Sequence, residues 1–470
     1  MTTDPPADEQ WRSLPSFDPI IEAISFIEQS SVMRPMEYLL ECSLQSETLE
    51  LSVEADLAGA MTRDAERLPL LLSSSLRVTE SSVDGVPCAV ERSGDRLWLL
   101  SGRSRPMGST VTCHLSYQGR LPSAYVLRET TGTWVELAPQ AFWYPFAFWD
   151  ATSAIPFRLS LDLPGGMVAV SNGNTLEEER GASGTRYVWS STGDAPGIAV
   201  LAGPYATRQT SRRNLVVRTC VRPDMTDQAD EIAAMLDQIA AVYIERFGPT
   251  PAGEITVVVP PHSVGGNWAL PRMIVAGQMS PECSRARRFG ILAHEGAHQW
   301  WGHAVRFDFA SALWLAEGLT AFSELSARLK LEGERATVDH LSQWTLPRYV
   351  AAREAKVALA ECRVDSPHSQ ELREDASAVF LALLRKRMGA AEFDRRLKAF
   401  YRAYAGHTAT SVAFVHAMTD GTPESLRGFV SGWLHCPKLP EVSAEEVLAG
   451  IRQEGAPADN LTSRGEKARS

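Results

Sequence analysis

A pair of histidines one helical turn apart constrains the fold of this chain more than any other feature of its sequence. His294 and His298 enclose Glu295 in the pattern His-Glu-x-x-His. On a helix, residues four positions apart point about 40° from each other around the axis, so both imidazoles can reach one metal ion. Glu295 then projects beside them, where a water molecule bound to that ion would sit. The pattern therefore predicts a helix that contributes two metal ligands.

A carboxylate on a second predicted helix completes this ligand set. Glu317 lies in the run Trp-Leu-Ala-Glu-Gly-Leu, inside a predicted helix over residues 311–330. Two histidines and one glutamate leave one coordination position for water, which is typical of a catalytic zinc ion rather than a structural one. The alternative is an ordinary amphipathic helix whose histidines face solvent or a satisfied core, but chance does not supply these segments in order. We therefore expect one Zn²⁺ per chain, bound by His294, His298 and Glu317, with Glu295 as the general base.

These segments resemble the gluzincin metallopeptidases of the aminopeptidase-N family. In that family the HExxH motif continues as HQWxG and is followed at the same spacing by a WLxEGxA segment; here the continuation reads Gln299-Trp300-Trp301-Gly302. The resemblance implies a zinc-dependent peptidase. It also implies a role for Glu324, two helical turns after Glu317, because the family usually has a glutamate there that can orient a ligand histidine. A solvated surface glutamate is the alternative at this position.

Sequence periodicity divides the chain into a β-rich half and a mainly helical half. Over residues 36–220 apolar and polar residues alternate as in strands, most strictly at residues 49–57, and clusters of Gly, Pro, Asn and Asp mark turns. The resemblance implies a saddle-like antiparallel β domain followed by a thermolysin-like, mainly helical catalytic domain, so the predicted fold class is α+β with two domains. We expect strands at residues 254–259 and 272–276, and helices at residues 226–248, 287–302, 311–330, 375–388 and 392–404.

Four successive regions follow from these patterns. We expect residues 1–30 to form a partly disordered N-terminal extension, residues 31–220 the β-saddle domain, and residues 221–453 the zinc catalytic domain. Residues 454–470 are polar and charged, which predicts a disordered tail.

Charge and composition limit the partners and the location. Lys and Arg number 46 against 57 Asp and Glu, a net charge of -11, which argues against nucleic acid and anionic membrane surfaces as partners. The N-terminus lacks the features of a signal peptide and no apolar stretch reaches membrane-spanning length, so we expect a cytoplasmic protein. The seven cysteines are scattered and form no CxxC pair, which predicts buried thiols rather than disulfides or a thiolate zinc site. The oligomeric state stays open.

The segment upstream of the histidine pair departs from the family pattern. Family aminopeptidases have a GxMEN block there, whose glutamate pairs with the free α-amine of the substrate; the matching stretch here puts Gly266 at that glutamate's position. Asn267 and Trp268 persist, so Gly265, Gly266, Asn267 and Trp268 are predicted to line the substrate cleft and to bind an extended peptide backbone. Without the carboxylate, we expect a specificity that is not strictly for free amines.

A second departure concerns the group that stabilises the oxyanion. The family has a YxKG motif whose tyrosine donates this hydrogen bond, and counting back from Met388-Gly389 places Glu374 at the tyrosine position. A carboxylate there repels a developing oxyanion unless it is protonated. His368, Tyr349 and Tyr144 are the other possible donors, although each has a purely structural role as its alternative.

Three functions remain compatible with the sequence. The first is a zinc metallopeptidase of altered specificity that cleaves peptide or amide bonds with a metal-activated water. The second is a non-peptidase zinc hydrolase or cyclase that takes part in the biosynthesis of a small molecule or of a peptide, for example by acting on a small amide, ester or lactone. The third is a catalytically silent scaffold that binds peptides. The intact ligands and Glu295 argue against the third, because a scaffold has no need of that base.

Overall fold

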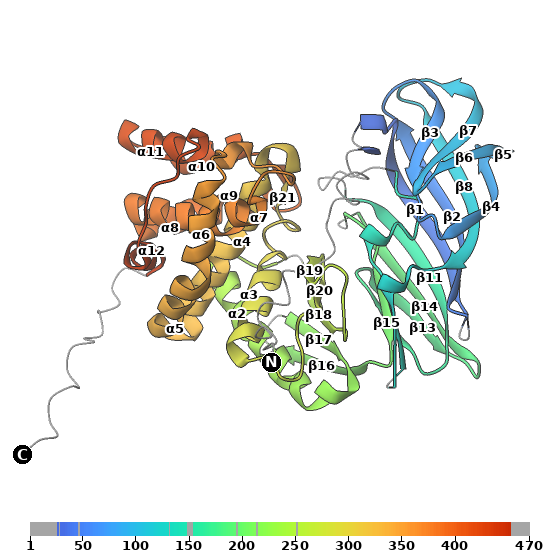
Figure 1. The fold of residues 1–470 in the computed structure, drawn as a ribbon, viewed down its shortest axis with the longest axis horizontal. Coiled ribbons are helices and arrows are strands. Elements are labelled where there is room, and N and C mark those ends of the chain that lie inside the picture. Colours follow the sequence, from blue (N-terminus) through green and yellow to red (C-terminus); the bar gives the residue numbers. More distant parts are fainter. Residues whose placement is uncertain are drawn as a thin grey trace, which may run out of the picture.

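The computed structural model describes residues 26–27, 29–45, 48–130, 132–147, 154–193, 196–212, 215–250 and 252–452. Most of the predicted N-terminal extension and all of the predicted tail lie outside the described residues. Figure 1 shows a β lobe (β1–β15), a helical lobe (α3–α12) and, between them, a small sheet (β16–β20) that carries α2. The predicted α+β fold class, with a β-rich domain followed by a mainly helical one, is confirmed.

An eight-stranded sheet forms the larger part of the β lobe. In β2 every second residue is buried, among them Leu51, Val53, Ala55 and Leu57. Their side chains face the core while those of their neighbours face outward, as the alternation predicts. Every strand pair is antiparallel except β1 with β11, which run parallel. The strands, in sheet order, are β13 (Asn174–Arg180), β14 (Gly184–Thr192), β11 (Pro156–Pro164), β1 (Met33–Leu44), β2 (Glu50–Met61), β8 (Thr110–Arg120), β4 (Leu76–Val83) and β5 (Val86–Pro87).

Two smaller sheets complete the β lobe. A three-stranded sheet packs its apolar face into the same core as the eight-stranded sheet. A four-stranded sheet packs against the small sheet between the lobes (β16–β20), which is called the central sheet from here on. The first contains β3 (Ala65–Leu71), β7 (Arg96–Arg105) and β6 (Ala89–Ser93), and the second β12 (Val168–Ser171), β15 (Val200–Gly203), β10 (Gly132–Leu137) and β9 (Val126–Glu129).

The central sheet joins the two lobes because its two faces belong to different cores. Its strands, in order, are β16 (Ala206–Arg212), β17 (Leu215–Val221), β18 (Glu254–Val259), β20 (Met273–Ala276) and β19 (Asn267–Leu270). In β18, Val257 packs against α2 (Ala229–Arg246) and the helical lobe, whereas Val258 packs against the four-stranded sheet. β18 has the predicted bounds. The predicted domain boundary after residue 220 lies within β17, and the division into domains stays a prediction.

The helices predicted over residues 287–302, 311–330, 375–388 and 392–404 are present, two of them with clearly different bounds, and the other helices of this lobe were not predicted. The helix predicted over residues 287–302 ends at Ala297, because the chain turns back through Gly302, which has a φ of 117°. The helix predicted from residue 375 begins at Ser377, after a π-helical turn at Leu372–Ala376. The helices are α3 (Arg285–Ala297), α4 (Phe309–Leu331), α5 (Gly333–His340), α6 (Leu346–Glu354), α7 (Ser369–Glu371), α8 (Ser377–Met388), α9 (Ala390–Tyr404), α10 (Ser411–Thr419), α11 (Glu424–His435) and α12 (Ala444–Ile451), with β21 (Arg306–Phe307) and β22 (Thr408–Ala409).

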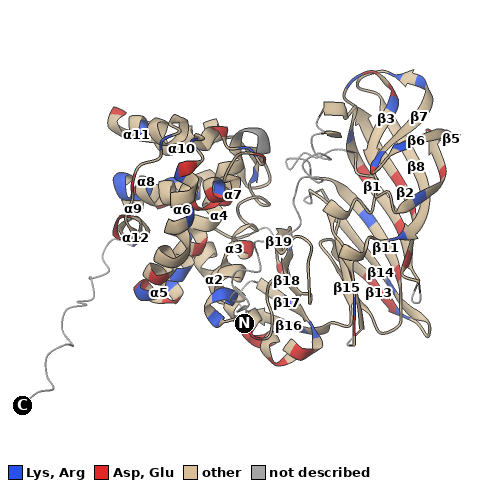
Figure 2. Cartoon of the chain, viewed as in Figure 1, with Lys and Arg blue, Asp and Glu red and all other residues tan. Residues whose placement is uncertain are grey.

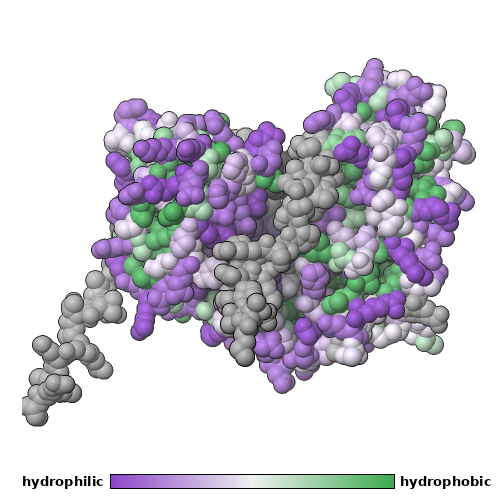
Figure 3. All heavy atoms as spheres, viewed as in Figure 1, coloured by the Kyte–Doolittle hydropathy of each residue, from purple (hydrophilic) through white to green (hydrophobic). Residues whose placement is uncertain are grey.

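The surface is mixed in charge and in polarity. Basic and acidic residues are distributed over both lobes (Figure 2), and hydrophilic and hydrophobic residues are interspersed on the face shown in Figure 3. Within the described ranges, none of the helices has both the length and the apolar character needed to cross a bilayer. All seven cysteines are free thiols, and four of them are buried.

Candidate metal centre

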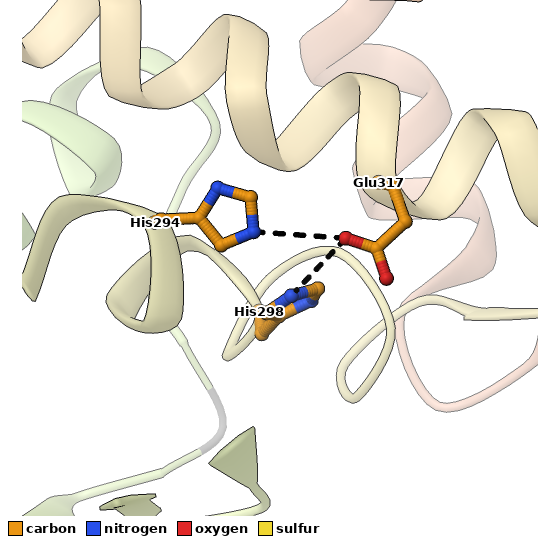
Figure 4. Close-up of side chains that lie close together, drawn as sticks. All are labelled: His294, His298 and Glu317. Atoms are coloured by element: carbon orange, nitrogen blue, oxygen red, sulfur yellow. Dashed lines mark ion pairs between the residues drawn. The ribbon is translucent and has the colours of Figure 1, made fainter. Parts of the chain in front are cut away.

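The predicted ligands converge from two helices that pack against each other (Figure 4). α3 begins after Ser284, whose side chain accepts a hydrogen bond from the backbone N–H of Arg287, and it carries His294 in its last turn. His298 caps the C-terminal end of this helix, and Glu317 projects from α4. Oε2 of Glu317 lies 3.6 Å from Nε2 of His294 and 3.6 Å from Nε2 of His298. The structure therefore brings the three side chains to one point.

This donor set fits a zinc ion. One ligand atom from each of the three residues lies within 4.8 Å of the other two. Zinc bonds of about 2.0–2.1 Å at tetrahedral angles place neighbouring ligand atoms about 3.4 Å apart, close to the separations from Glu317. Two imidazole nitrogens and one carboxylate oxygen are the ligands of many catalytic zinc sites. Among the described residues this is the one group of His, Cys, Asp and Glu side chains with the spacing of a metal site.

Each histidine is oriented by a partner at its other nitrogen. Nδ1 of His298 donates a hydrogen bond to the carbonyl oxygen of Trp301, at 3.1 Å. This contact depends on the turn at Gly302, where a Cβ would lie 3.4 Å from Nδ1 of His298. Nδ1 of His294 lies 3.7 Å from Oε2 of Glu324. Both rings therefore present Nε2 to Glu317, which is the tautomer that a metal requires.

Glu324 is held behind His294 rather than on the surface. Its side chain is 12% exposed and lies 3.0 Å from Arg328 and 3.6 Å from His340. Burial alone would raise the pKa of Glu324, but its contact with His294 and the charges of His340 and Arg328 lower that pKa to about 2. An ionised carboxylate in this place favours a fixed orientation of His294.

Glu295 lies beside the ligands in a buried position. It is almost fully buried and lines the same cavity as His294, His298 and Glu317. Burial, opposed by His294 and assisted by the negative charge of Glu317, raises the pKa of Glu295 to about 8. A carboxylate with a raised pKa next to a metal site is suited to accept and return a proton near neutral pH.

The cavity in front of these residues has a volume of about 580 Å³ and lies between the two lobes. α3 and α4 form its metal side, and the β lobe contributes Pro139 and Pro196. Gly265, Asn267 and Trp268 line it as predicted, and β19 is the edge strand of the central sheet. Gly266, in the same turn with a φ of 69°, is not itself part of the lining.

Gln278 occupies the space beside Gly266, which the sequence did not indicate. A Cβ on Gly266 would lie 3.2 Å from Nε2 of Gln278. The backbone N–H of Gln278 donates a hydrogen bond to Oδ1 of Asn267, at 3.0 Å. This contact fixes the orientation of the Asn267 amide, whose Nδ2 donates to Oε1 of Gln278, also at 3.0 Å. Nε2 of Gln278 therefore lies on the side of Gly266, and Gln278 lines the cavity. An N–H donor thus stands beside the position at which the family motif has a carboxylate.

Three of the four possible oxyanion donors are not brought to the cavity. The Tyr144 hydroxyl accepts a hydrogen bond from the N–H of Ile198 in the β-lobe core. The Tyr349 hydroxyl donates to the carbonyl of Pro440, at 2.7 Å. The His368 side chain is 40% exposed and lies 4.0 Å from Glu371. None of the three lines the cavity, because two of them are core tyrosines bonded to the backbone and the third faces outward.

Glu374 does line the cavity, next to Arg373 in the π-helical turn. Its carboxylate lies 2.9 Å from Arg348, which also lies 2.6 Å from Asp375. Burial is the main reason that the pKa of Glu374 is raised, against the lowering influence of His294. Sequence reasoning named Glu374 but missed Arg373 and Gln278, because neither belongs to a motif.

Comparison with known proteins shows which proteins this chain is similar to. Residues 257–433 match the model of the peptidase family M1 domain. Aminopeptidase N of Lactococcus lactis subsp. lactis is 24% identical over 319 residues, which is 63% of this chain and 38% of that protein. Aminopeptidase M1 of Arabidopsis thaliana is 24% identical over 322 residues, 64% of this chain and 36% of that protein. The matched part of the chain thus spans less than two fifths of the length of these curated relatives.

Solved structures show the same fold. A mutant M1 zinc metallopeptidase from Deinococcus radiodurans, bound to a Tyr-Ser-Ala substrate, superposes with a TM-score of 0.68 at 17% sequence identity, covering 88% of this chain and 96% of that chain. A mutant two-domain M1 zinc metallopeptidase bound to L-tryptophan gives a TM-score of 0.69 at 18% identity, with the same coverage. Residues 257–433 of the chain are therefore similar to a peptidase family M1 domain, and the fold of the chain is that of the solved M1 zinc metallopeptidases.

Proposed function

We propose that this protein is a zinc-dependent metallopeptidase that hydrolyses peptide or amide bonds. The observation that supports this most strongly is the convergence of His294, His298 and Glu317 on one point, with Glu295 beside them in a cavity between the lobes. A zinc ion bound by these ligands would polarise the carbonyl of the substrate and lower the pKa of a bound water molecule. One ion per chain accounts for all three side chains.

Glu295 and Glu324 have separate roles in this proposal. Glu295 accepts the proton of the attacking water and returns it to the leaving amine, which is the work of a general base and then a general acid. Its raised pKa matches that exchange. Glu324 lies behind His294 and orients its imidazole.

The substrate side of the cavity supports a specificity that is not strictly for free amines. An extended peptide can add to the exposed edge of β19, through backbone hydrogen bonds. At the place where a family aminopeptidase holds the α-amine, Gly266 has no side chain and Gln278 offers N–H donors. The N–H groups of a protonated α-amine cannot hydrogen-bond to the N–H donors of Gln278. The carbonyl of an acyl cap or of a preceding residue, by contrast, accepts a hydrogen bond from Gln278. Internal or N-blocked peptides are therefore the favoured substrates.

A second candidate function rests on the absence of a hydroxyl donor. No Ser, Thr or Tyr occurs among the described residues that line the cavity, so the phenol expected to stabilise an oxyanion has no direct replacement. A non-peptidase zinc hydrolase or cyclase with a more reactive substrate needs that donor less. A silent peptide-binding scaffold is the third candidate, and the retained Glu295 argues against it.

Elemental analysis together with two substrate sets tests the proposal. We expect about one zinc per chain in the purified protein, and hydrolysis of N-acetylated peptides that stops in Glu295→Gln while zinc is retained. Rapid cleavage of aminoacyl anilides with no cleavage of N-acetylated peptides would overturn the specificity. A protein that stays free of zinc in zinc-replete medium would overturn the proposal as a whole.

A further inference from the structure

Arg373 stands next to the metal ligands and has no place in the family motifs described above. It belongs to the π-helical turn Leu372–Ala376, which packs against α4. At Gly318, the residue after Glu317, a Cβ would lie 2.4 Å from Cβ of Ser377 and 3.5 Å from the carbonyl oxygen of Arg373. Because Gly318 lacks a side chain, the π-helical turn approaches α4 closely, and Arg373 reaches the cavity that Glu317 also lines.

The guanidinium of Arg373 has no direct hydrogen-bonding or ion-pair partner among the described residues, although its charge favours the ionised forms of Glu317 and Glu374 from a longer distance. Its Nε is buried and has no hydrogen bond, and no ion pair or hydrogen bond of this side chain is found within the described part of the chain. Two other arginines in the helical lobe do form direct ion pairs. Arg348 pairs with Glu374 and Asp375, and Arg385 pairs with Asp394 at 2.8 Å. Partly buried charges in proteins are normally paired, so the exception calls for an external anion.

Glu374 makes no direct ion pair with Arg373, although the two charges interact from a longer distance. It follows Arg373 directly and lines the same cavity, but its carboxylate is 2.9 Å from Arg348. The other cavity carboxylates, Glu295, Glu317 and Glu324, lie on the metal side, where Glu317 faces the two histidines. The Arg373 guanidinium thus has no direct protein partner among the described residues and can bind what enters the cavity that it lines.

We propose that Arg373 binds a carboxylate of the substrate next to the scissile bond. This inference rests on the proposed function and deepens it by naming the substrate class, which is peptides or amides with an anionic carboxylate near the bond that is cut. A guanidinium presents a planar fork of N–H donors that matches a carboxylate in two parallel hydrogen bonds. The carboxylate can come from an acidic side chain or from a free C-terminus, and the experiment below separates these sources.

Binding measurements on the Glu295→Gln variant test the inference without turnover. The probes are N-acetyl-tetraalanine amide, four versions with one Glu at each position, their Gln counterparts, and N-acetyl-tetraalanine with a free C-terminal acid. By titration calorimetry we expect at least one carboxylate peptide to bind about tenfold or more tightly than its neutral counterpart. Discrimination among the Glu and Gln pairs indicates an acidic side chain, and discrimination between acid and amide indicates the C-terminus.

Variants at Arg373 identify the residue responsible. In Arg373→Met, combined with Glu295→Gln, the discrimination should fall to less than twofold, and in Arg373→Lys it should be retained in part, since the charge remains but the fork is lost. Arg402→Met is the matched control, because it removes the same charge from an exposed position on α9. Thermal unfolding curves check that each variant is folded.

The outcomes separate this inference from the proposed function. Equal binding of every charged and neutral pair, or discrimination that survives in Arg373→Met, overturns the role of Arg373 even if the protein contains zinc and cleaves peptides. Discrimination that depends on Arg373 supports the inference even in a protein that cleaves none of the probes.

Discussion

The two sides of the cavity differ in how closely they follow the family. The metal side, made by α3 and α4, brings His294, His298 and Glu317 together, with Glu324 beside His294 and with Glu295 lining the same cavity. On the substrate side, Gly266 and Glu374 stand where the family motifs have a glutamate and a tyrosine, and Gln278 and Arg373 line the cavity near them. The contrast indicates that the metal side keeps the family pattern while the substrate side departs from it.

The largest effect is expected from loss of a metal ligand. His298→Ala removes one of the three protein ligands, so we expect zinc content to fall to background and hydrolysis with it. His435→Ala, an exposed histidine on α11, is the control and should retain about one zinc per chain. Full zinc content in His298→Ala, measured by elemental analysis, would mean that the metal side is wrongly assigned.

Glu295→Gln should separate catalysis from metal binding. It retains the shape of the side chain but cannot accept a proton, so we expect kcat to fall by about 10²–10⁴ while zinc content stays near that of the wild type. Steady-state kinetics on an N-acetylated peptide measure the change. A variant with more than half the wild-type kcat would exclude Glu295 as the base.

Glu324→Ala should weaken the metal side without abolishing it. Removal of the carboxylate behind His294 frees the imidazole to rotate, and we expect zinc affinity to fall about 10–100-fold. Competition with a zinc chelator of known affinity gives the dissociation constant. An unchanged constant would place Glu324 among residues that only stabilise the fold.

The substrate side should respond in specificity rather than in metal content. Gln278→Glu places a carboxylate of the same shape beside Gly266, so we expect the ratio of kcat/KM for free-amine over N-acetylated peptides to rise about tenfold. Zinc content should not change. A ratio that stays constant would show that the wall at Gln278 does not contact the substrate N-terminus.

The smallest effect is expected at the far end of α3. Ser284→Ala removes the N-cap of the metal-ligand helix and should lower the free energy of unfolding by about 1 kcal/mol. Urea denaturation measures this change. Because the cap lies at the opposite end of the helix from His294, specificity and zinc content should match the wild type, and a loss of either would link the cap to the site.

Sequence reasoning found what depends on local pattern. The fold class follows from the change of periodicity, and α4 and β18 lie where apolar spacing predicted them. The ligands follow from a motif that spans the end of α3 and from a segment on α4. Helical geometry predicts that the two histidines can reach one ion, whereas the approach of Glu317 depends on the packing of α3 against α4.

What sequence reasoning missed depends on contacts between distant segments. The parallel pairing of β1 with β11 joins strands that are far apart along the chain. Gln278 faces Gly266 because β19 and β20 pair, and Arg373 reaches the cavity because Gly318 admits a π-helical turn, which has no simple sequence signal. Tyr144 and Tyr349 were named for their hydroxyls, but burial in the core decides their position.

X-ray absorption spectroscopy at the zinc edge tests the central claim most directly, because it reports the atoms around the metal in the protein as purified. The account predicts a first shell of four nitrogen and oxygen atoms at about 2.0–2.1 Å, with the scattering of two imidazole rings. In His294→Ala, which like His298→Ala lacks one of the three ligands, the zinc-edge signal should fall to background. A shell that contains sulfur, or a spectrum without imidazole scattering, would contradict a zinc ion held by His294, His298 and Glu317.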